Sequence, residues 1–92
     1  MSANNAEKPV LEFPVTYDLK VIFDNTLHQD LHLRNLELVL EDAAVEFSDV
    51  KFKPSRQGNY VSISVAIKLA SEVQMQLLYK QLRLLPGIKL AI

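Results

Sequence analysis

The fold is decided on either side of one short stretch in the middle of the chain, at residues 53–60. That stretch is Lys53-Pro54-Ser55-Arg56-Gln57-Gly58-Asn59-Tyr60. Apolar and polar residues alternate on both sides of it, and it contains one of the two glycines of the chain. Turns favour these residue types, because proline stiffens the entrance, glycine takes a positive φ and asparagine closes the turn. We therefore predict a hairpin connection between two strands here.

Two runs have the period-two alternation of a strand with one buried face. In the run over residues 15–24, the expected inward side chains are Val15, Tyr17, Leu19, Val21 and Phe23. In the run over residues 61–69, they are Val61, Ile63, Val65, Ile67 and Leu69. The second run is also dense in β-branched residues, which suits a central strand. We expect these two strands to form the centre of the sheet.

Two weaker runs are expected to form the edges of the same sheet. Residues 45–52 are apolar on one side, but the alternation shifts across Ser48-Asp49, as it does at a β-bulge or a short turn. Residues 88–92 form a short alternating strand at the end of the chain. An apolar edge strand of this kind can pair with another chain, so we expect a homodimer.

The first helix is predicted between the first two strands. Its apolar stripe has helical spacing and consists of Leu33, Leu36, Val39, Leu40 and Ala43. Thr26 and Gln29 have the spacing of a capping box, so the helix begins at Thr26 or, on the other interpretation, at Asp30.

The second helix is predicted to begin at another capping box, formed by Ser71 and Gln74. Its expected buried face consists of Val73, Leu77, Leu78, Leu82 and Leu85. Pro86-Gly87 should stop this helix, because proline cannot continue it and glycine readily takes a left-handed conformation.

The predicted order of elements is strand-helix-strand-strand-helix-strand. Two strand-helix-strand units with right-handed crossovers interleave into a four-stranded antiparallel sheet of order 4-1-3-2, with both helices on one face. This is an α+β fold, the ferredoxin-like βαββαβ plait. We expect residues 11–92 to form this single domain and residues 1–10 to be a disordered lead-in.

Composition excludes several classes of function. The chain has 92 residues, a net charge of -1, no cysteine and two glycines. It therefore lacks the broad positive field of a general nucleic-acid binder, thiolate chemistry and the glycine-rich loops that bind nucleotides. Since residues 1–9 are small and polar and no apolar run is long enough to span a membrane, we expect neither a signal peptide nor a membrane span. We expect a cytoplasmic protein without cofactor, membrane association or enzymatic activity.

His28 and His32 have the helical spacing of two metal ligands. The sequence offers no third ligand beside them and no glutamate in the arrangement of zinc proteases. We therefore interpret them as two solvated histidines, and we expect no metal site.

The motif Lys53-Pro54-Ser55, two further residues and Gly58-Asn59-Tyr60 resembles that of the YbeD-like family of small bacterial proteins of unknown function. The similarity continues through Val61-Ser62-Ile63-Ser64-Val65 and extends in weaker form over residues 12–92. The resemblance implies a ferredoxin-like fold close to the ACT regulatory domains, without an established enzymatic activity.

The candidate site is the same central stretch. Lys53 and Arg56 supply positive charge, and donors could come from Ser55, Gly58 and Asn59. Tyr60 adds an aromatic side chain that could contact a partner. We expect a regulatory or protein-interaction domain with an unidentified protein partner or small ligand. The alternatives are an ACT-like sensor with its ligand near the first strand-helix turn, an anion or RNA binder, and a purely structural turn.

Overall fold

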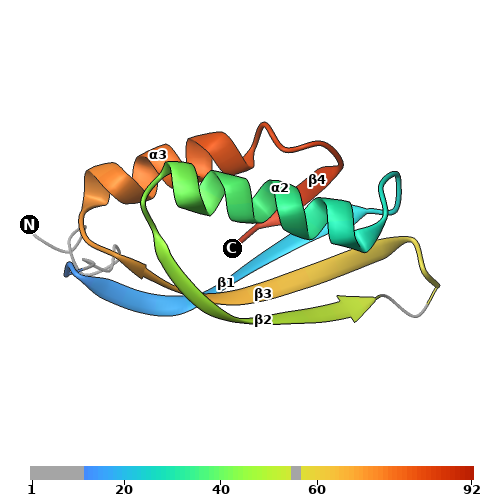
Figure 1. Ribbon diagram of the computed structural model, residues 1–92, viewed down its shortest axis with the longest axis horizontal. Coiled ribbons are helices and arrows are strands. Elements are labelled where there is room, and N and C mark those ends of the chain that lie inside the picture. The colour runs from blue at the N-terminus through green and yellow to red at the C-terminus, as the bar shows by residue number, and fades with distance from the viewer. Residues whose placement is uncertain (1–11, 55–56) are drawn as a thin grey trace, which may run out of the picture.

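The computed structural model describes residues 12–54 and 57–92, and its elements follow the predicted order. Their bounds are β1 Val15–Asp24, α2 Gln29–Asp42, β2 Glu46–Pro54, β3 Tyr60–Leu69, α3 Glu72–Leu82 and β4 Ile88–Ala91. Both helices cover the same face of the sheet, and neither covers the other face (Figure 1). The lead-in predicted over residues 1–10 lies outside the described residues.

The sheet is antiparallel and has the order β2-β3-β1-β4, which confirms the predicted order 4-1-3-2 and the ferredoxin-like plait. The central pair is β1 and β3, and their register runs without interruption from Val15 opposite Leu69 to Asp24 opposite Tyr60. This register places the two predicted inward sets opposite one another. The central pairing was therefore predictable from the alternation alone.

Strand β2 contains the predicted irregularity. Its register with β3 shifts between Ser48 and Lys51, and Asp49 has a φ of 56°. The bulge keeps Phe47 and Phe52 opposite the inward-facing Ile67 and Ile63. Without the extra residue, the second half of β2 would turn its apolar side chains toward water.

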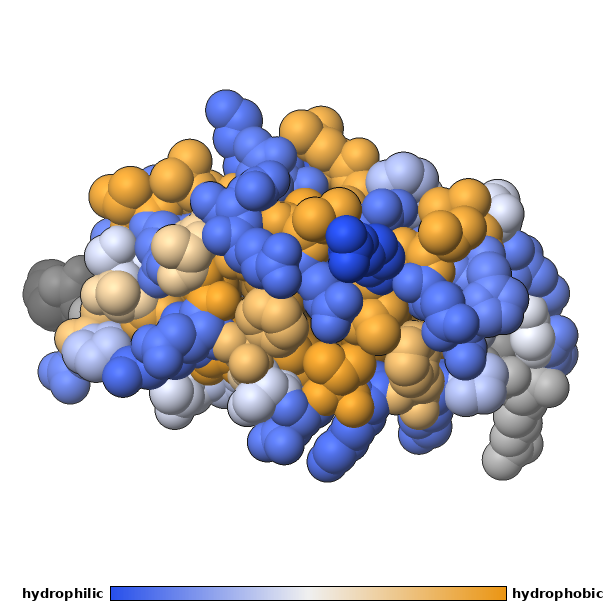
Figure 2. Space-filling view, viewed as in Figure 1, coloured by the Kyte–Doolittle hydropathy of each residue, from blue (hydrophilic) through white to orange (hydrophobic). Residues whose placement is uncertain are grey.

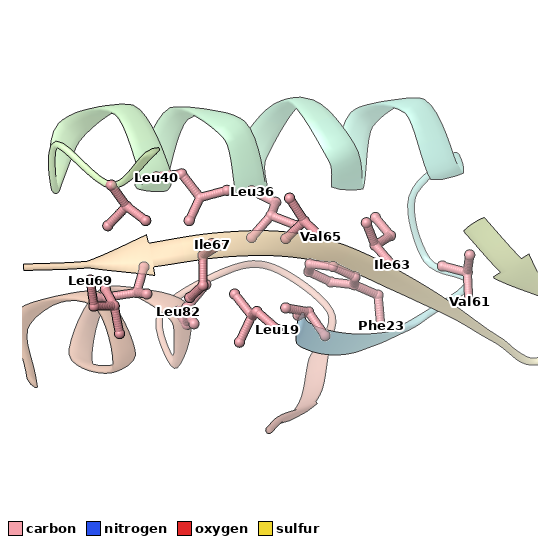
Figure 3. Packing of buried hydrophobic residues seen from close by; sticks show 13 residues of the cluster. Leu19, Phe23, Leu36, Leu40, Val61, Ile63, Val65, Ile67, Leu69 and Leu82 are labelled. Atoms are coloured by element: carbon pink, nitrogen blue, oxygen red, sulfur yellow. The ribbon is translucent and has the colours of Figure 1, made fainter. Parts of the chain in front are cut away.

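The core lies between the sheet and the helices. On β1 the side chains of Leu19, Val21 and Phe23 are fully buried, and on α2 the same holds for Leu36 and Leu40. Figure 3 shows Leu36 and Leu40 directed from α2 onto β3, with Phe23 on the neighbouring strand. Burial of each such side chain stabilises the fold by about 1.5–3 kcal/mol. The stripe predicted for the first helix is confirmed.

Helix α2 begins at Gln29, between the two starts considered from the sequence. Its N-cap is His28, whose Nδ1 accepts a hydrogen bond of 3.1 Å from the amide of Asp30. The predicted capping box of Thr26 with Gln29 does not form, because the amide and hydroxyl of Thr26 donate to the Asp24 carboxylate instead. Short polar side chains often form such local turns in competition with a helix cap.

Half of the second capping box is present. The Ser71 hydroxyl caps α3 by accepting from the amide of Gln74 at 3.1 Å. The Gln74 side chain accepts from the amide of Ala70 at 2.6 Å, and its Nε2 donates to the carbonyls of Ala43 and Ala44 at 3.0 and 2.9 Å. Gln74 therefore joins the start of α3 to the end of α2.

The buried face predicted for the second helix is partly wrong. Leu78 and Leu82 are fully buried, but Val73 and Leu77 are 66% and 51% exposed. Met75 and Tyr79 face the core in their place. The helix also ends at Leu82, four residues before the predicted stop at Pro86. Because α3 has apolar residues on most of its sides, its own pattern does not decide which side meets the sheet.

A polar contact joins α3 to the sheet. The hydroxyl groups of Tyr17 on β1 and Tyr79 on α3 are 2.7 Å apart and share a hydrogen bond. Burial, followed by this hydrogen bond, raises the pKa of Tyr17 above its usual value. The Tyr17 hydroxyl therefore stays protonated. Its side chain packs against the core, as the alternation in β1 predicts.

Candidate functional site

Lys53 lies in β2 rather than in the connection. The strand extends through Pro54, and Lys53 is exposed opposite Ser62 of β3. Because directly opposed residues share a face of the sheet, Lys53 lies on the same side as Ser62, the side without helices. Ser55 and Arg56 lie outside the described residues.

The connection between β2 and β3 has the predicted turn geometry at its centre. Gly58 has a φ of 72°, a conformation that glycine adopts at no steric cost. The Asn25 side chain donates a hydrogen bond of 3.1 Å to the Gly58 carbonyl, and the Asn59 side chain donates to that of Gln57 at 3.4 Å. The bond from Asn25 joins this connection to the turn between β1 and α2.

A shallow cavity of about 200 Å³ lies where these two segments meet. Its lining consists of Asn25, Leu27, His28, Gln29, Pro54, Gly58, Tyr60 and Val61. The fold thus brings Gly58 and Tyr60 of the predicted site beside the turn at which an ACT-like ligand was considered. Tyr60 is 47% exposed and opposes Asp24, on the face without helices.

The turn after β1 is organised by Asp24. Its Oδ1 accepts from the amide and the hydroxyl of Thr26, and its Oδ2 lies 3.9 Å from Nζ of Lys89. The hydrogen bond from the Thr26 side chain, followed by that from its amide, lowers the pKa of the Asp24 carboxyl. Asp24 is therefore held as a carboxylate by groups of its own fold.

The prediction of two solvated histidines is wrong for His32. His28 is exposed, but His32 is fully buried and stacks on Phe23 with ring centroids 4.3 Å apart. Nε2 of His32 is 2.9 Å from the carbonyl of Asp24, so this nitrogen donates the hydrogen bond. Nδ1 is then a buried acceptor with no hydrogen-bond partner among the described residues. The spacing of His32, Leu36 and Leu40 was the sequence signal for this burial.

Each of the two histidines uses a ring nitrogen within its own turn. In the described part of the chain, no group of three or more histidine, aspartate or glutamate side chains is placed to hold a metal ion. His32 also uses its Nε2 for the bond to Asp24, and His28 uses its Nδ1 to cap α2. Both side chains thus have structural roles at the β1–α2 turn.

Across the described ranges, no helix is long and apolar enough to cross a membrane.

Comparison with known proteins identifies the family of this chain. Residues 8–92 match the family model described as "Protein of unknown function (DUF493)". A UPF0250 protein of Vibrio cholerae is 39% identical over 75 residues, which cover 82% of this chain and 78% of the relative. A UPF0250 protein of Bordetella parapertussis is 26% identical over 87 residues, covering 94% and 93%.

Two solved structures share the fold. The solution structure of HP0495 from Helicobacter pylori has a TM-score of 0.74 at 18% identity and covers 100% of this chain and 96% of its own. The C-terminal domain of MgtC from Mycobacterium tuberculosis has a TM-score of 0.65 at 13% identity, covering 90% and 89%. At these identities the likeness concerns the fold alone. The chain belongs to the DUF493 family, the UPF0250 or YbeD-like proteins, whose function is unknown.

Proposed function

We propose that this chain is a regulatory or protein-interaction domain without enzymatic activity, and that it works as a homodimer joined through β4. The observation that supports this best is the position of that strand at the edge of the sheet formed by the described residues. β4 pairs with β1 on one side, and Leu90 and Ile92 are 46% and 58% exposed. An exposed apolar edge strand is a template for pairing with another chain.

The backbone of β4 is suited to a second pairing. Ile92 exchanges two hydrogen bonds with Lys20 of β1, at 2.8 and 2.9 Å. In an antiparallel ladder, residues that bond to the partner strand alternate with residues that do not. The amide and carbonyl of Ala91 therefore point away from β1, toward the outer edge. A twofold axis through this edge would pair β4 with its own copy.

A hollow beside β4 could receive a side chain of the second copy. It has a volume of about 420 Å³ and is lined by Tyr79 and Arg83 of α3 and by residues 88–91. Leu90 lies both in this lining and on the exposed edge. A symmetric dimer would then cover this hollow with the β4 edge of the other copy.

The opposite edge of the sheet is protected against such pairing. β2 carries Lys51, Lys53 and Pro54 together with the bulge after Ser48. Lysine, proline and bulges are the usual means by which an edge strand avoids another chain. The contrast between the two edges supports β4 as the pairing strand.

Sedimentation equilibrium over a concentration series tests the dimer. We expect a mass that rises toward that of a dimer, and a Leu90→Asp variant that stays monomeric because it would bury a charge at the interface. Leu38→Asp is the matched control, since Leu38 is similarly exposed on α2. A strict monomer up to high micromolar concentration would contradict the proposal.

The second candidate is a small-molecule sensor, and the Asn25–Gly58 hydrogen bond favours it. A ligand in the adjacent cavity would contact both the β1–α2 turn and the β2–β3 connection. The volume of about 200 Å³ is below the usual size of ligand pockets, so only a small metabolite would fit. NMR titration with amino acids should shift resonances of residues 25–29 and 58–61, and Asn25→Ala should weaken the response. Unchanged spectra would remove this candidate.

A further inference from the structure

We infer that the open face of the sheet, the side without helices, binds an acidic segment of a partner protein. This names a partner class for the interaction domain proposed above and does not require the β4 dimer. The inference rests on the cross-strand register. The register brings lysines from β1 and β2 together on one part of the open face, although these two strands are not neighbours in the sheet.

Two rows of residues cross all four strands at this place. The first row, from β2 to β4, is Lys51, Ser64, Lys20 and Ile92. The second row is Lys53, Ser62, Ile22 and Leu90. Directly opposed residues share a face, and adjacent strands lie about 4.8 Å apart. Three ammonium groups therefore border two serine hydroxyls on a patch roughly 10 Å wide, with apolar side chains toward β4.

These lysines are available to a partner. Lys20, Lys51 and Lys53 are all exposed, and none forms an ion pair with a carboxylate in the ranges 12–54 and 57–92. The carboxylates next to the patch are Asp18 and Asp24 along β1 and the exposed Asp49 in the bulge of β2. Asp24 is already held by Thr26 and Lys89, which leaves Asp18 and Asp49 against three lysines. The patch thus keeps an excess of positive charge that carboxylates of another protein could neutralise. In Figure 2, hydrophilic side chains project along the lower border, the sheet side of the molecule.

The open face is also hollowed beside the patch. A depression of about 520 Å³ is lined by Thr16, Tyr17, Asp18, Glu46, Phe47, Ser48, Ala66, Ile67 and Lys68. The outward side chains at the centre of this region, Ala66 and Ser48, are small and lie opposite one another. A segment whose acidic residues lie over the lysines could place its next bulky side chain in this depression.

The chemistry of the face favours protein over RNA. RNA-binding plaits stack bases on aromatic side chains of the two central strands. Here the outward residues of those strands across the patch and the depression are Thr16, Asp18, Lys20, Ile22, Ser62, Ser64, Ala66 and Lys68. Ile22, on the β1 side of the patch, instead provides an apolar contact for an amphipathic segment.

Fluorescence anisotropy with a labelled peptide of alternating glutamate and leucine tests the inference. The comparison probes are the same peptide with glutamine for glutamate, and a labelled oligouridylate. We expect the glutamate peptide to bind, to bind more weakly as salt is raised, and to shift the amide resonances of Ser62 and Ser64. The double variant Lys51→Gln/Lys53→Gln should weaken binding about tenfold.

The control is Arg34→Gln/Lys80→Gln, which removes the same charge from exposed positions on α2 and α3, on the other side of the sheet. Equal losses in the two double variants would overturn the inference, since they would indicate general charge attraction. No binding of the glutamate peptide, or tighter binding of the oligouridylate, would also overturn it. None of these outcomes depends on the oligomeric state, which sedimentation measures separately.

Discussion

At the scale of single residues, the β1–α2 turn depends on Asp24 and Gly87, which come from distant parts of the chain. The Asp24 amide donates to the Gly87 carbonyl at 2.8 Å, and the Asp24 carbonyl accepts from buried His32. A Cβ on Gly87 would lie 2.6 Å from Oδ1 of Asp24 and 2.9 Å from Cε1 of His32. A side chain at position 87 would therefore have to displace Asp24 and His32 in this turn.

Replacement of Asp24 by asparagine should make stability less dependent on acid pH. The Asp24 pKa is lowered in the fold, so its carboxylate stabilises the fold above the unfolded pKa of about 3.9. That contribution is lost as the pH falls through the lowered folded pKa. We expect Asp24→Asn to be less stable than the native chain at neutral pH, and the difference to shrink below about pH 4. Urea denaturation at both pH values measures this.

Asp18→Asn provides the comparison, because Asp18 is an exposed aspartate on the same strand. A constant difference between Asp24→Asn and the native chain across the acid range would contradict the role given to the Asp24 carboxylate.

Gly87 and Gly58 provide a matched pair of substitutions. Their φ angles are 74° and 72°, so alanine meets the same backbone strain at both, about 1–2 kcal/mol. A Cβ at Gly58 has no atom within 4 Å, whereas a Cβ at Gly87 collides with Asp24 and His32. We expect Gly58→Ala to lower the free energy of unfolding by about 1–2 kcal/mol and Gly87→Ala by about 2–5 kcal/mol. Equal losses in chemical denaturation would show that the collision relaxes without cost.

At the scale of elements, hydrogen bonds from one side chain, Gln74, join the two helices. Helix α2 ends at Asp42 and is followed by a left-handed residue, Ala44, with a φ of 58°. The amides of Ala44 and Val45 bond back to the carbonyls of Glu41 and Leu40. Gln74 then donates to carbonyls of Ala43 and Ala44. Gln74 thereby joins the start of α3 to the residues that follow α2.

Gln74→Ala should weaken this junction. The variant loses two hydrogen bonds to α2 and one to Ala70, and each contributes about 0.5–1.5 kcal/mol. We expect a loss of roughly 2–3 kcal/mol in the free energy of unfolding, together with faster amide exchange in residues 41–45. Gln76→Ala, an exposed glutamine two residues further along α3, is the control and should change stability little. Similar losses in the two variants would contradict the role of Gln74.

At the scale of the whole molecule, pairing through β4 would join the two sheets edge to edge. A twofold axis perpendicular to the sheets would place both open faces on one side of the dimer and the four helices on the other. A partner with two acidic segments would then bind both copies at once and gain affinity without new contacts.

A dimer also predicts that thermal stability depends on protein concentration. Association adds stability only to the folded state, so the unfolding midpoint should rise as the concentration is raised. We expect this rise for the native chain and for Leu38→Asp, and its loss in Leu90→Asp. Scanning fluorimetry over a hundredfold range of concentration measures it, and a midpoint independent of concentration would contradict the dimer.

The sequence by itself determined the order of elements, the sheet order and the bulge. A strand has a period of two, so the alternation in residues 15–24 and 61–69 leaves only one face to bury. The turn at Gly58 was predictable for a similar reason, since only a glycine takes that φ without strain. Of the candidate site, the sequence indicated Lys53, Gly58 and Tyr60 as neighbours at one end of the sheet.

Only the tertiary structure decided which side of α3 is buried, what encloses His32 and which lysines gather on the open face. A helix with apolar residues on several sides has no preferred face until a sheet is packed against it, so Val73 and Leu77 are exposed while Met75 and Tyr79 are not. The spacing of His32 with Leu36 and Leu40 placed it on the buried side of α2, but only the fold brings Phe23 and Gly87 from two other segments to enclose it. Lys20 and Lys51 flank Ser64 because the strand register pairs both of them with it. Register is a property of paired strands, so the sequence of one strand does not determine it.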